Sequence, residues 1–221
     1  QNTTASNNSA FGHNALKANT TGDTCSAFGK TSLQANTTGT NNTAIGHNAL
    51  GANTTGINNT TIGDQAGANI TTGDNNTTIG TSSGTDAVHN IVTSDNRIVV
   101  GNNTNTNAYI KIDWTVTSDE RDKMNFGEVP HGLSFVNDLQ PVKFDFKKSR
   151  ENATPHGKTK YGFKAQDILA LEGDNPIIID NDNEDNLKVT NSHLIPILVK
   201  ALQELSEKND ALEARLKTLE G

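Results

Sequence analysis

The sequence of 221 residues contains little cysteine, little aromatic character and no concentration of basic charge. Its one cysteine, Cys25, cannot form an intrachain disulfide or a cysteine-based zinc site, so we expect a small buried side chain there. No apolar run approaches the roughly 18 residues of a membrane helix, and no signal peptide is visible. A net charge of -7 without a basic patch argues against nucleic acid as a partner. We therefore expect neither membrane insertion nor nucleic-acid binding.

The sequence also lacks the residue patterns that are typical of metal and cofactor sites. None of the six histidines has the spacing of a metal site. The acidic stretch from Asp180 to Asp185 resembles a calcium loop, but it lacks a glycine at the sixth position and has Asn191 where a bidentate glutamate is needed. We interpret it as a solvated turn and expect no metal and no cofactor. Because the sequence begins at Gln1 and Met124 is its only methionine, we expect a fragment of a longer protein.

Charge is distributed unevenly along the chain. Residues 1–117 hold 4 Lys+Arg and 6 Asp+Glu, whereas residues 118–221 hold 14 and 19. Regions of such different composition rarely share one core, so the sequence predicts a domain boundary at Thr117-Ser118. We expect three segments: a repeat shaft over 1–84, a connecting β segment over 85–117 and a compact domain over 118–221.

The first segment is built from a 17-residue repeat. An apolar residue followed by glycine recurs five times at this interval, at Phe11, Phe28, Ile45, Ile62 and Ile79. A strict period of this kind is typical of small units that bury their apolar faces by stacking. The Ser-Ala-Phe or Thr-Ala-Ile triplet suits a short strand, and the Asn-Thr-Thr-Gly tract suits turns.

The sequence therefore predicts a mainly β shaft, a β-helix or β-roll, with the large apolar residue of each unit in its core. One such residue in 17 makes a thin core for a single chain, which favours several chains packed together. The handedness of the shaft stays open. A flexible Asn/Thr/Gly-rich stalk is the alternative, but it gives no reason for the regular spacing. The tract resembles the Ser/Thr-Ala-Ile-Gly repeats of trimeric adhesin heads and phage tail-fibre shafts.

After the repeat, residues 88–92 and 97–101 are predicted as strands, and the alternation from Ile110 to Val116 as a third. The next hundred residues mix patterns and indicate an α+β domain. Helices are predicted near Leu133 to Leu139 and over Ala165 to Leu171. Strands are predicted over 141–146, 161–163, 176–179 and 187–189, with a polar, basic loop over 147–160.

The last segment, residues 193–220, has the heptad pattern of a coiled-coil helix. Pro196 fits if the helix begins just before it, with Asn191 or Ser192 as its cap. A polar residue, Asn209, interrupts the otherwise apolar seam, and such residues fix register. The alternative is an amphipathic helix packed on its own domain. The predicted seam consists of Ile195, Leu198, Leu202, Leu205, Asn209, Leu212, Leu216 and Leu219.

Four separated motifs in this half carry a resemblance to a known family. They are Thr117-Ser118-Asp119-Glu120-Arg121 with Lys123, Leu139 to Phe144, Gly162 to Asp167, and Leu194-Ile195-Pro196 before the heptad helix. In this order they resemble the intramolecular chaperone domain, peptidase S74, of phage tailspikes and tail fibres. The resemblance covers about 104 residues from Ser118 onward.

The resemblance implies a domain that trimerises, templates the folding of the preceding fibre and then cuts itself off before the motif serine. Carried over, the cleaved bond joins Thr117 to Ser118, Ser118 is the nucleophile and Lys123 completes a Ser-Lys dyad. A serine hydroxyl needs such a base to take its proton. The two residues lie about 140° apart around a regular helix, so the segment must turn between them or Lys123 must act on a neighbouring chain.

Other interpretations of these residues remain open. Asp119 and Glu120 are rival bases or supporting groups. Thr117 and Glu120 also match a capping box, which would make the stretch an ordinary helix start.

The sequence as a whole predicts the C-terminal part of a phage tail fibre or tailspike, located in the virion. We expect a homotrimer, a host-cell surface receptor that is a glycan, and release of the chaperone domain in the host cytoplasm. The alternative is a trimeric surface adhesin with a permanent, non-proteolytic trimerisation domain.

Overall fold

A computed structural model describes residues 4–86, 89–111 and 115–220. The chain divides into two compact units, residues 1–108 and residues 109–221, which are described separately here. In the described part of the chain, no helix is long and apolar enough to cross a membrane.

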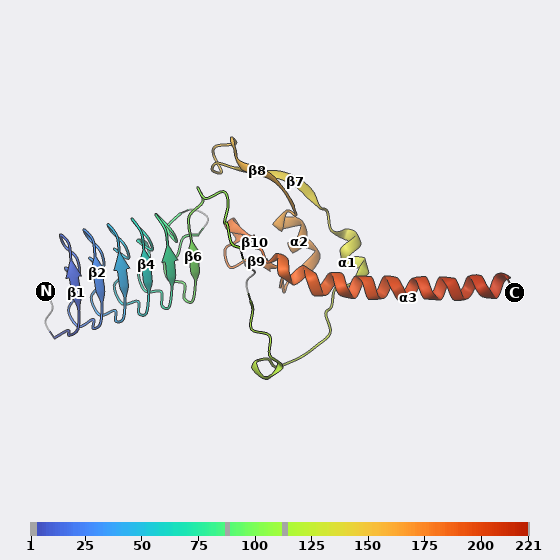
Figure 1. Cartoon of the computed structure of the whole chain (residues 1–221), viewed down its shortest axis with the longest axis horizontal. Helices are drawn as coiled ribbons and strands as arrows, with labels where there is room; N and C mark the ends of the chain where they lie inside the picture. Colours follow the sequence, from blue (N-terminus) through green and yellow to red (C-terminus); the bar gives the residue numbers. More distant parts are fainter. Residues whose placement is uncertain (1–3, 87–88, 112–114, 221) are drawn as a thin grey trace. The chain divides into compact units, whose positions relative to one another are not determined.

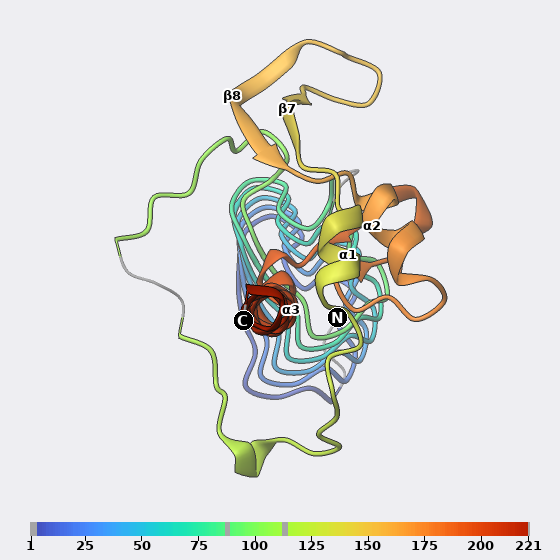
Figure 2. The same cartoon turned by 90° about the vertical axis from the view of Figure 1, so that its right-hand side faces the viewer.

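The first unit is a β-solenoid in which each repeat forms one rung (Figure 1). Six three-residue strands form one parallel sheet in chain order: β1 Ser9–Phe11, β2 Ser26–Phe28, β3 Thr43–Ile45, β4 Thr60–Ile62, β5 Thr77–Ile79 and β6 Ile98–Val100. The first five strands pair at the 17-residue interval, whereas Thr77 of β5 pairs with Ile98 of β6, an interval of 21. Viewed end on, successive rungs nearly superpose (Figure 2). The predicted β-helical shaft is therefore confirmed, and the same sheet continues to residue 100.

The large residue of each triplet lies outside the solenoid, which corrects the prediction that it forms the core. In β2 to β5 the middle residue of the strand is buried and the last is exposed. The exposed fraction is 76% for Phe11 and 45% for Phe28, whereas Ala27 and Ala44 are fully buried. Alternate residues of a strand point to opposite faces, so only one side chain in three points inward. We call the exposed column the apolar stripe: Phe11, Phe28, Ile45, Ile62, Ile79 and Val100.

The interior changes composition between the third and fourth rungs. Leu33 and Leu50 are fully buried at equivalent positions, and the next equivalent residue is Gly67. Three residues later in each rung, Asn36 and Asn53 are followed by Ile70. A Cβ on Gly67 would lie 3.0 Å from Cδ1 of Ile70, so the isoleucine fills the space that leucine occupies in earlier rungs.

The buried asparagines form a ladder on one side of this change. The Nδ2 of Asn36 donates to Oδ1 of Asn19, and that of Asn53 to Oδ1 of Asn36, both at 2.7 Å. The ladder ends at Ile70, and within the described residues Oδ1 of Asn53 is buried without a hydrogen bond. Buried amides of this kind stabilise a fold only where each of them finds a hydrogen-bond partner in the neighbouring rung.

Tight turns between the strands require left-handed backbone at fixed positions. One column of residues has φ between 56° and 58°, and it contains asparagine at every rung except at Thr24: Asn7, Thr24, Asn41, Asn58, Asn75 and Asn96. Gly46 has φ of 135°, and a Cβ there would lie 2.3 Å from the carbonyl oxygen of Gly63. Only glycine permits this approach between rungs.

In its described residues, the second unit combines two short α-helices, three 3-10 turns, two antiparallel strand pairs and one long helix. The helices are α1 Leu133–Asp138, α2 Ala165–Glu172 and α3 Leu194–Glu220, with 3-10 turns η1 Glu120–Asp122, η2 Glu184–Asn186 and η3 Asn191–His193. Strand β7 Val142–Lys147 pairs antiparallel with β8 Pro155–Gly162, and β9 Ile179–Asp180 with β10 Lys188–Val189. The predicted α+β composition and terminal helix are confirmed.

Three details of the predictions are wrong. Strand β8 begins at Pro155, inside the stretch predicted as a loop. Residues 89–92 form no strand, and Val88 lies outside the described residues. The strand predicted from Ile110 to Val116 is absent at residues 109–111 and 115–117, while its centre, 112–114, lies outside the described residues.

A small core joins three of the four sequence motifs. Leu139, which follows α1, and Leu194, which begins α3, are buried in one cluster with Phe135, Ile168 and Ile178, and Phe163 of the third motif packs against this cluster. The start of α3 supplies Leu194, Ile197 and Ala201 to this core. Pro196 falls in its first turn as expected, but the residues predicted as a cap form the 3-10 turn η3 instead. These motifs thus act by holding the domain together.

Candidate functional site

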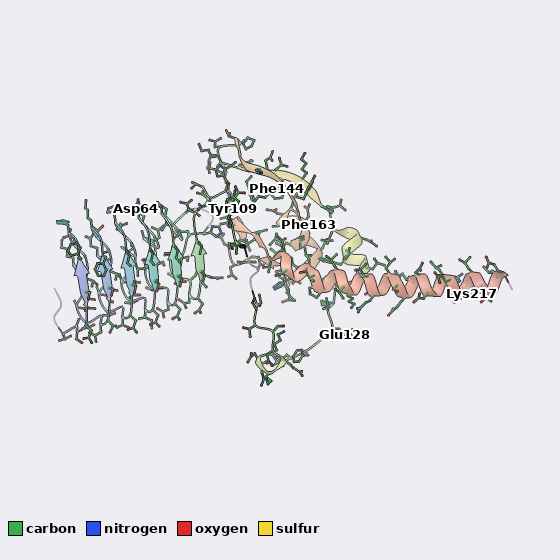
Figure 3. All side chains as sticks on the ribbon, in the orientation of Figure 1. Asp64, Tyr109, Glu128, Phe144, Phe163 and Lys217 are labelled. Carbon is green, nitrogen blue, oxygen red and sulfur yellow. The ribbon has the colours of Figure 1, made fainter. Side chains whose placement is uncertain are left out.

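The predicted site lies on an extended segment that precedes α1. Residues 115–128 are all exposed, and Glu128 is the last residue of this exposed segment (Figure 3). The segment is attached to α3 at its end: the Nζ of Lys200 donates to the carbonyl oxygen of Val129 at 2.6 Å, and Oε2 of Glu204 accepts from the backbone N of Leu133 at 2.8 Å. The site therefore lies on an exposed segment that is attached to α3 at its C-terminal end.

The 3-10 turn η1 brings Ser118 and Lys123 together. The side chain of Asp119 accepts from the backbone N of Arg121, which caps the turn, and the N of Lys123 donates to the carbonyl oxygen of Glu120 at 3.1 Å. This reversal places the Nζ of Lys123 2.7 Å from the Oγ of Ser118. The turn that their spacing requires is present within a single chain. The cap is Asp119, so the capping box that begins at Thr117 is not formed.

Arg121 holds the carboxylate of Asp119. Its Nε lies 3.0 Å from Oδ1 and its Nη2 2.6 Å from Oδ2, a bidentate contact. The hydrogen bonds from the Arg121 side chain, and then from its backbone, lower the pKa of Asp119, and the same ion pair raises the pKa of Arg121. A carboxylate bound in this way is a weak proton acceptor. The sequence indicates Asp119 as a rival base, but it does not predict the ion pair with Arg121.

Glu120 is exposed, and in the described part of the chain it makes no hydrogen bond with Ser118. The Ser118 hydroxyl instead accepts a hydrogen bond from the Lys123 amine. Ser118 and Lys123 are themselves exposed, as are the neighbouring apolar side chains of Val116 and Met124. The arrangement can support proton transfer from a hydroxyl to an amine, provided that the amine is neutral.

Among the described residues, no group of three or more histidine, cysteine, aspartate or glutamate side chains could hold a metal ion. Asp180 of the acidic turn instead forms an ion pair with Lys188, with 3.4 Å between Oδ2 and Nζ.

The predicted seam of α3 is exposed to solvent. The exposed fraction ranges from 44% at Leu198 to 83% at Leu219, and Lys217 near the same end also projects from the helix (Figure 3). Asn209 donates from Nδ2 to Oε1 of Glu213 at 3.4 Å. Since α3 packs on its own domain through Leu194, Ile197 and Ala201, the seam side chains are left on a different face.

Comparison with known protein families gives a match over part of the chain. No curated protein and no solved structure is significantly similar to this chain. Residues 118–174 match the model of the peptidase S74 family, described as the chaperone of endosialidase. The match begins at Ser118 and covers the site, α1, the β7–β8 pair and α2. It supports a chaperone role of the tail-fibre or tailspike type and, in general terms, a self-cleaving peptidase activity. Residues 118–174 thus form a chaperone domain of the peptidase S74 family.

Proposed function

We propose that the second unit assembles three copies of this chain, guides the folding of the shaft and then cuts the bond between Thr117 and Ser118. The observation that carries the proposal is the distance of 2.7 Å between Lys123 Nζ and Ser118 Oγ, at the first residue of the family match. The protein would then be the C-terminal part of a phage tail fibre or tailspike, with the shaft retained in the virion.

The chemistry is a single acyl transfer followed by hydrolysis. Neutral Lys123 takes the proton of the Ser118 hydroxyl, and the oxygen attacks the carbonyl carbon of Thr117. The C–O bond forms as the C–N bond breaks, and the proton passes to the amine of Ser118. The resulting ester between Thr117 and the Ser118 side chain is hydrolysed by water, which releases the carboxylate of Thr117. Each chain is cut once.

Neighbouring copies would complete the site. A lysine acts as a base only without its proton, and exclusion of water favours the neutral form. In the single chain Ser118 and Lys123 are both exposed. We propose that assembly covers this segment and so activates Lys123. Cleavage would then follow assembly, an order that prevents release of the chaperone domain before the shaft is formed.

Three copies would associate through the exposed seam of α3. Its apolar side chains repeat as heptads, and Asn209 fixes their register at some cost in stability. Linking the chains at one end raises the effective concentration of the shafts. A shaft with a 17-residue period offers wrong pairings displaced by whole rungs, so a register set at one end speeds correct assembly. After cleavage the shaft would be retained by a high barrier to unfolding.

The remaining parts of the proposal concern the assembled particle. The full fibre would contact a host-cell surface receptor, which we propose to be a glycan, and the released domain would remain in the host cytoplasm. If no cleavage occurs, the second unit would instead be the permanent trimerisation domain of a trimeric surface adhesin.

Expression of the wild type and three variants tests the proposal. The wild type should yield two fragments, and mass spectrometry should find Ser118 as the new N-terminus. Ser118→Ala should stay whole. Lys123→Arg should also stay whole, because a guanidinium keeps its positive charge but cannot accept the proton. Asp122→Asn, in the same exposed turn, should be cut like the wild type. Identical banding of wild type and Ser118→Ala would refute self-cleavage and favour the adhesin.

A further inference from the structure

The outward face of the solenoid sheet is large, regular and free of charge. It consists of two columns that alternate with the buried residues: the apolar stripe, and a column that runs from Ser9 through Ser26, Thr43, Thr60 and Thr77 to Ile98. Neither column contains a charged residue. All six members of the stripe are at least 40% exposed. Contiguous apolar surface of this kind marks a site of protein association.

Charged and titratable side chains flank this face. Directly after the glycines that follow the first four strands come His13, Lys30, His47 and Asp64, and His47 contacts Asp64 of the next rung at 2.8 Å. An uncharged centre with a polar rim is the usual organisation of a protein interface.

The spacing of the stripe identifies its partner as another copy of this chain. Its side chains project from consecutive strands of a parallel sheet, in register from Phe11 to Val100. They therefore repeat at the distance between strands, about 4.8 Å. The stripe of a second copy has the same spacing, so each apolar side chain of one copy can contact the equivalent side chain of the other. A partner of unrelated sequence does not offer apolar side chains at this spacing. The exposed seam of α3 is a second surface in the same chain with a regular apolar pattern.

The stripe also carries a marker of position. Its first two residues, Phe11 and Phe28, are aromatic, and the next three, Ile45, Ile62 and Ile79, are aliphatic. Displacing one copy by one rung would pair Phe28 with Ile45 and leave the Phe11 ring of one copy without a partner. Aromatic rings contribute more than aliphatic side chains to such contacts, through both area and ring geometry.

We infer that parallel copies of this chain pack in register through the apolar stripe, and that the step from phenylalanine to isoleucine selects that register. The inference rests on the association of copies in the proposed function and adds the shaft surface that they share. The step from phenylalanine to isoleucine would thus distinguish the correct register between copies from registers displaced by whole rungs.

Disulfide formation in the full chain tests the inference. In a Cys25→Asn background, Ile45→Cys should become linked to Ile45→Cys of another copy on mild oxidation. Thr55→Cys, exposed in the same rung but outside the sheet, is the matched control and should stay largely unlinked. A disulfide needs Cα atoms within about 7 Å, so it discriminates between neighbouring rungs.

Mixed refolding then tests the register. Copies with Ile45→Cys are refolded with copies that carry Ile62→Cys, and peptide masses identify the links. We expect links between identical positions, with mixed links roughly tenfold rarer. Changing both Phe11 and Phe28 to isoleucine should raise the mixed fraction several-fold. Equal mixed and identical links in the unaltered stripe would overturn the register assignment.

The outcomes separate this inference from the proposed function. Copies that associate in light scattering yet form no link at position 45 would contradict the stripe interface while leaving trimerisation by α3 intact. Links at position 45 in a chain that is never cut would support the stripe and contradict self-cleavage. A chain that remains monomeric at all concentrations would refute the stripe interface as well.

Discussion

The Sγ of Cys25 lies 3.3 Å from the carbonyl oxygen of Gly39, in the place where the side-chain amide of other rungs donates a hydrogen bond. One rung later, Nδ2 of Asn42 donates to the carbonyl oxygen of Gly56 at 2.7 Å, and its Oδ1 accepts from the backbone N of Asn59 at 2.9 Å. A thiol is a weak donor and a weak acceptor. In the second rung, the donation to the carbonyl oxygen and the acceptance from the next backbone N are therefore both weaker than in the third rung.

Cys25→Asn should stabilise the shaft. The new amide would donate to Gly39 and accept from the backbone N of Asn42, so we expect a gain of about 1 kcal/mol in the free energy of unfolding. Denaturant unfolding followed by circular dichroism measures it. Cys25→Ala, which removes the thiol without adding an amide, is the control and should not gain stability.

The same thiol predicts a loss of stability at alkaline pH. Burial raises the pKa of Cys25 above its ordinary value of 9.0. The folded state thus keeps its proton where the unfolded state has lost it, so the contribution is complete below about pH 9 and falls as the pH rises through the folded pKa. Cys25→Asn should lack this decline. Parallel curves of unfolding free energy against pH for the two proteins would contradict the prediction.

Thr24 is a second weak point in the same rung. It has φ of 57° in a column otherwise occupied by asparagine, and β-branched residues tolerate this conformation poorly. Thr24→Asn should relieve strain and let the new side chain donate to Asn41, as Asn41 does to Asn58. We expect about 1 kcal/mol of stabilisation. The reverse change, Asn58→Thr, should cost a similar amount in thermal unfolding.

Glu204 links α3 to the segment that carries the candidate site. Its carboxylate accepts from the backbone N of Leu133 at the start of α1, a position where the helix has no other side-chain cap. Glu204→Ala should destabilise the second unit by about 1–2 kcal/mol. Glu207→Ala, an exposed position on the same helix, should have little effect. Equal unfolding midpoints for the two variants would show that this contact is not stabilising.

The seam of α3 should control both association and cleavage. Leu205→Asp places a charge in the exposed apolar seam, so it should shift copies towards monomers and reduce cleavage at least tenfold. Ala214→Asp, at an outward heptad position, is the matched control. Light scattering measures the first effect and a gel the second. Full cleavage by a monomeric Leu205→Asp protein would show that one chain completes its own site.

The period of the repeat predicts the strands and their pairing within the chain, because consecutive identical units stack with equivalent residues opposite each other. It does not predict which side chain points inward. A strand of three residues has one inward position, and a narrow rung accommodates Ala27 or Thr61 there but not a phenylalanine. Hydrophobicity alone favours the opposite arrangement. The period does not predict the place of strand β6 in the sheet, because its interval from β5 is 21 residues and not 17.

Other differences have equally local causes. Strand β8 carries lysine, histidine and threonine on a two-stranded sheet that is exposed along most of its length, so it has no apolar alternation. Conversely, residues 109–111 alternate, but within the ranges that the structure describes no strand pairs with them. At the candidate site, the spacing of Ser118 and Lys123 implied a turn and η1 provides it. The ion pair between Asp119 and Arg121 depends on side-chain geometry that spacing does not specify.

The junction between Asn53 and Ile70 bears on how such a shaft changes length. Duplication of a unit that contains Asn36 and Leu33 would extend the amide ladder and the leucine column together, because both neighbours are of the same kind. The same unit placed beyond Ile70 would create a second boundary and a second buried oxygen without a donor. Copying units inside either segment would therefore change the length of the shaft without a new boundary, whereas exchanging units between the segments would add one.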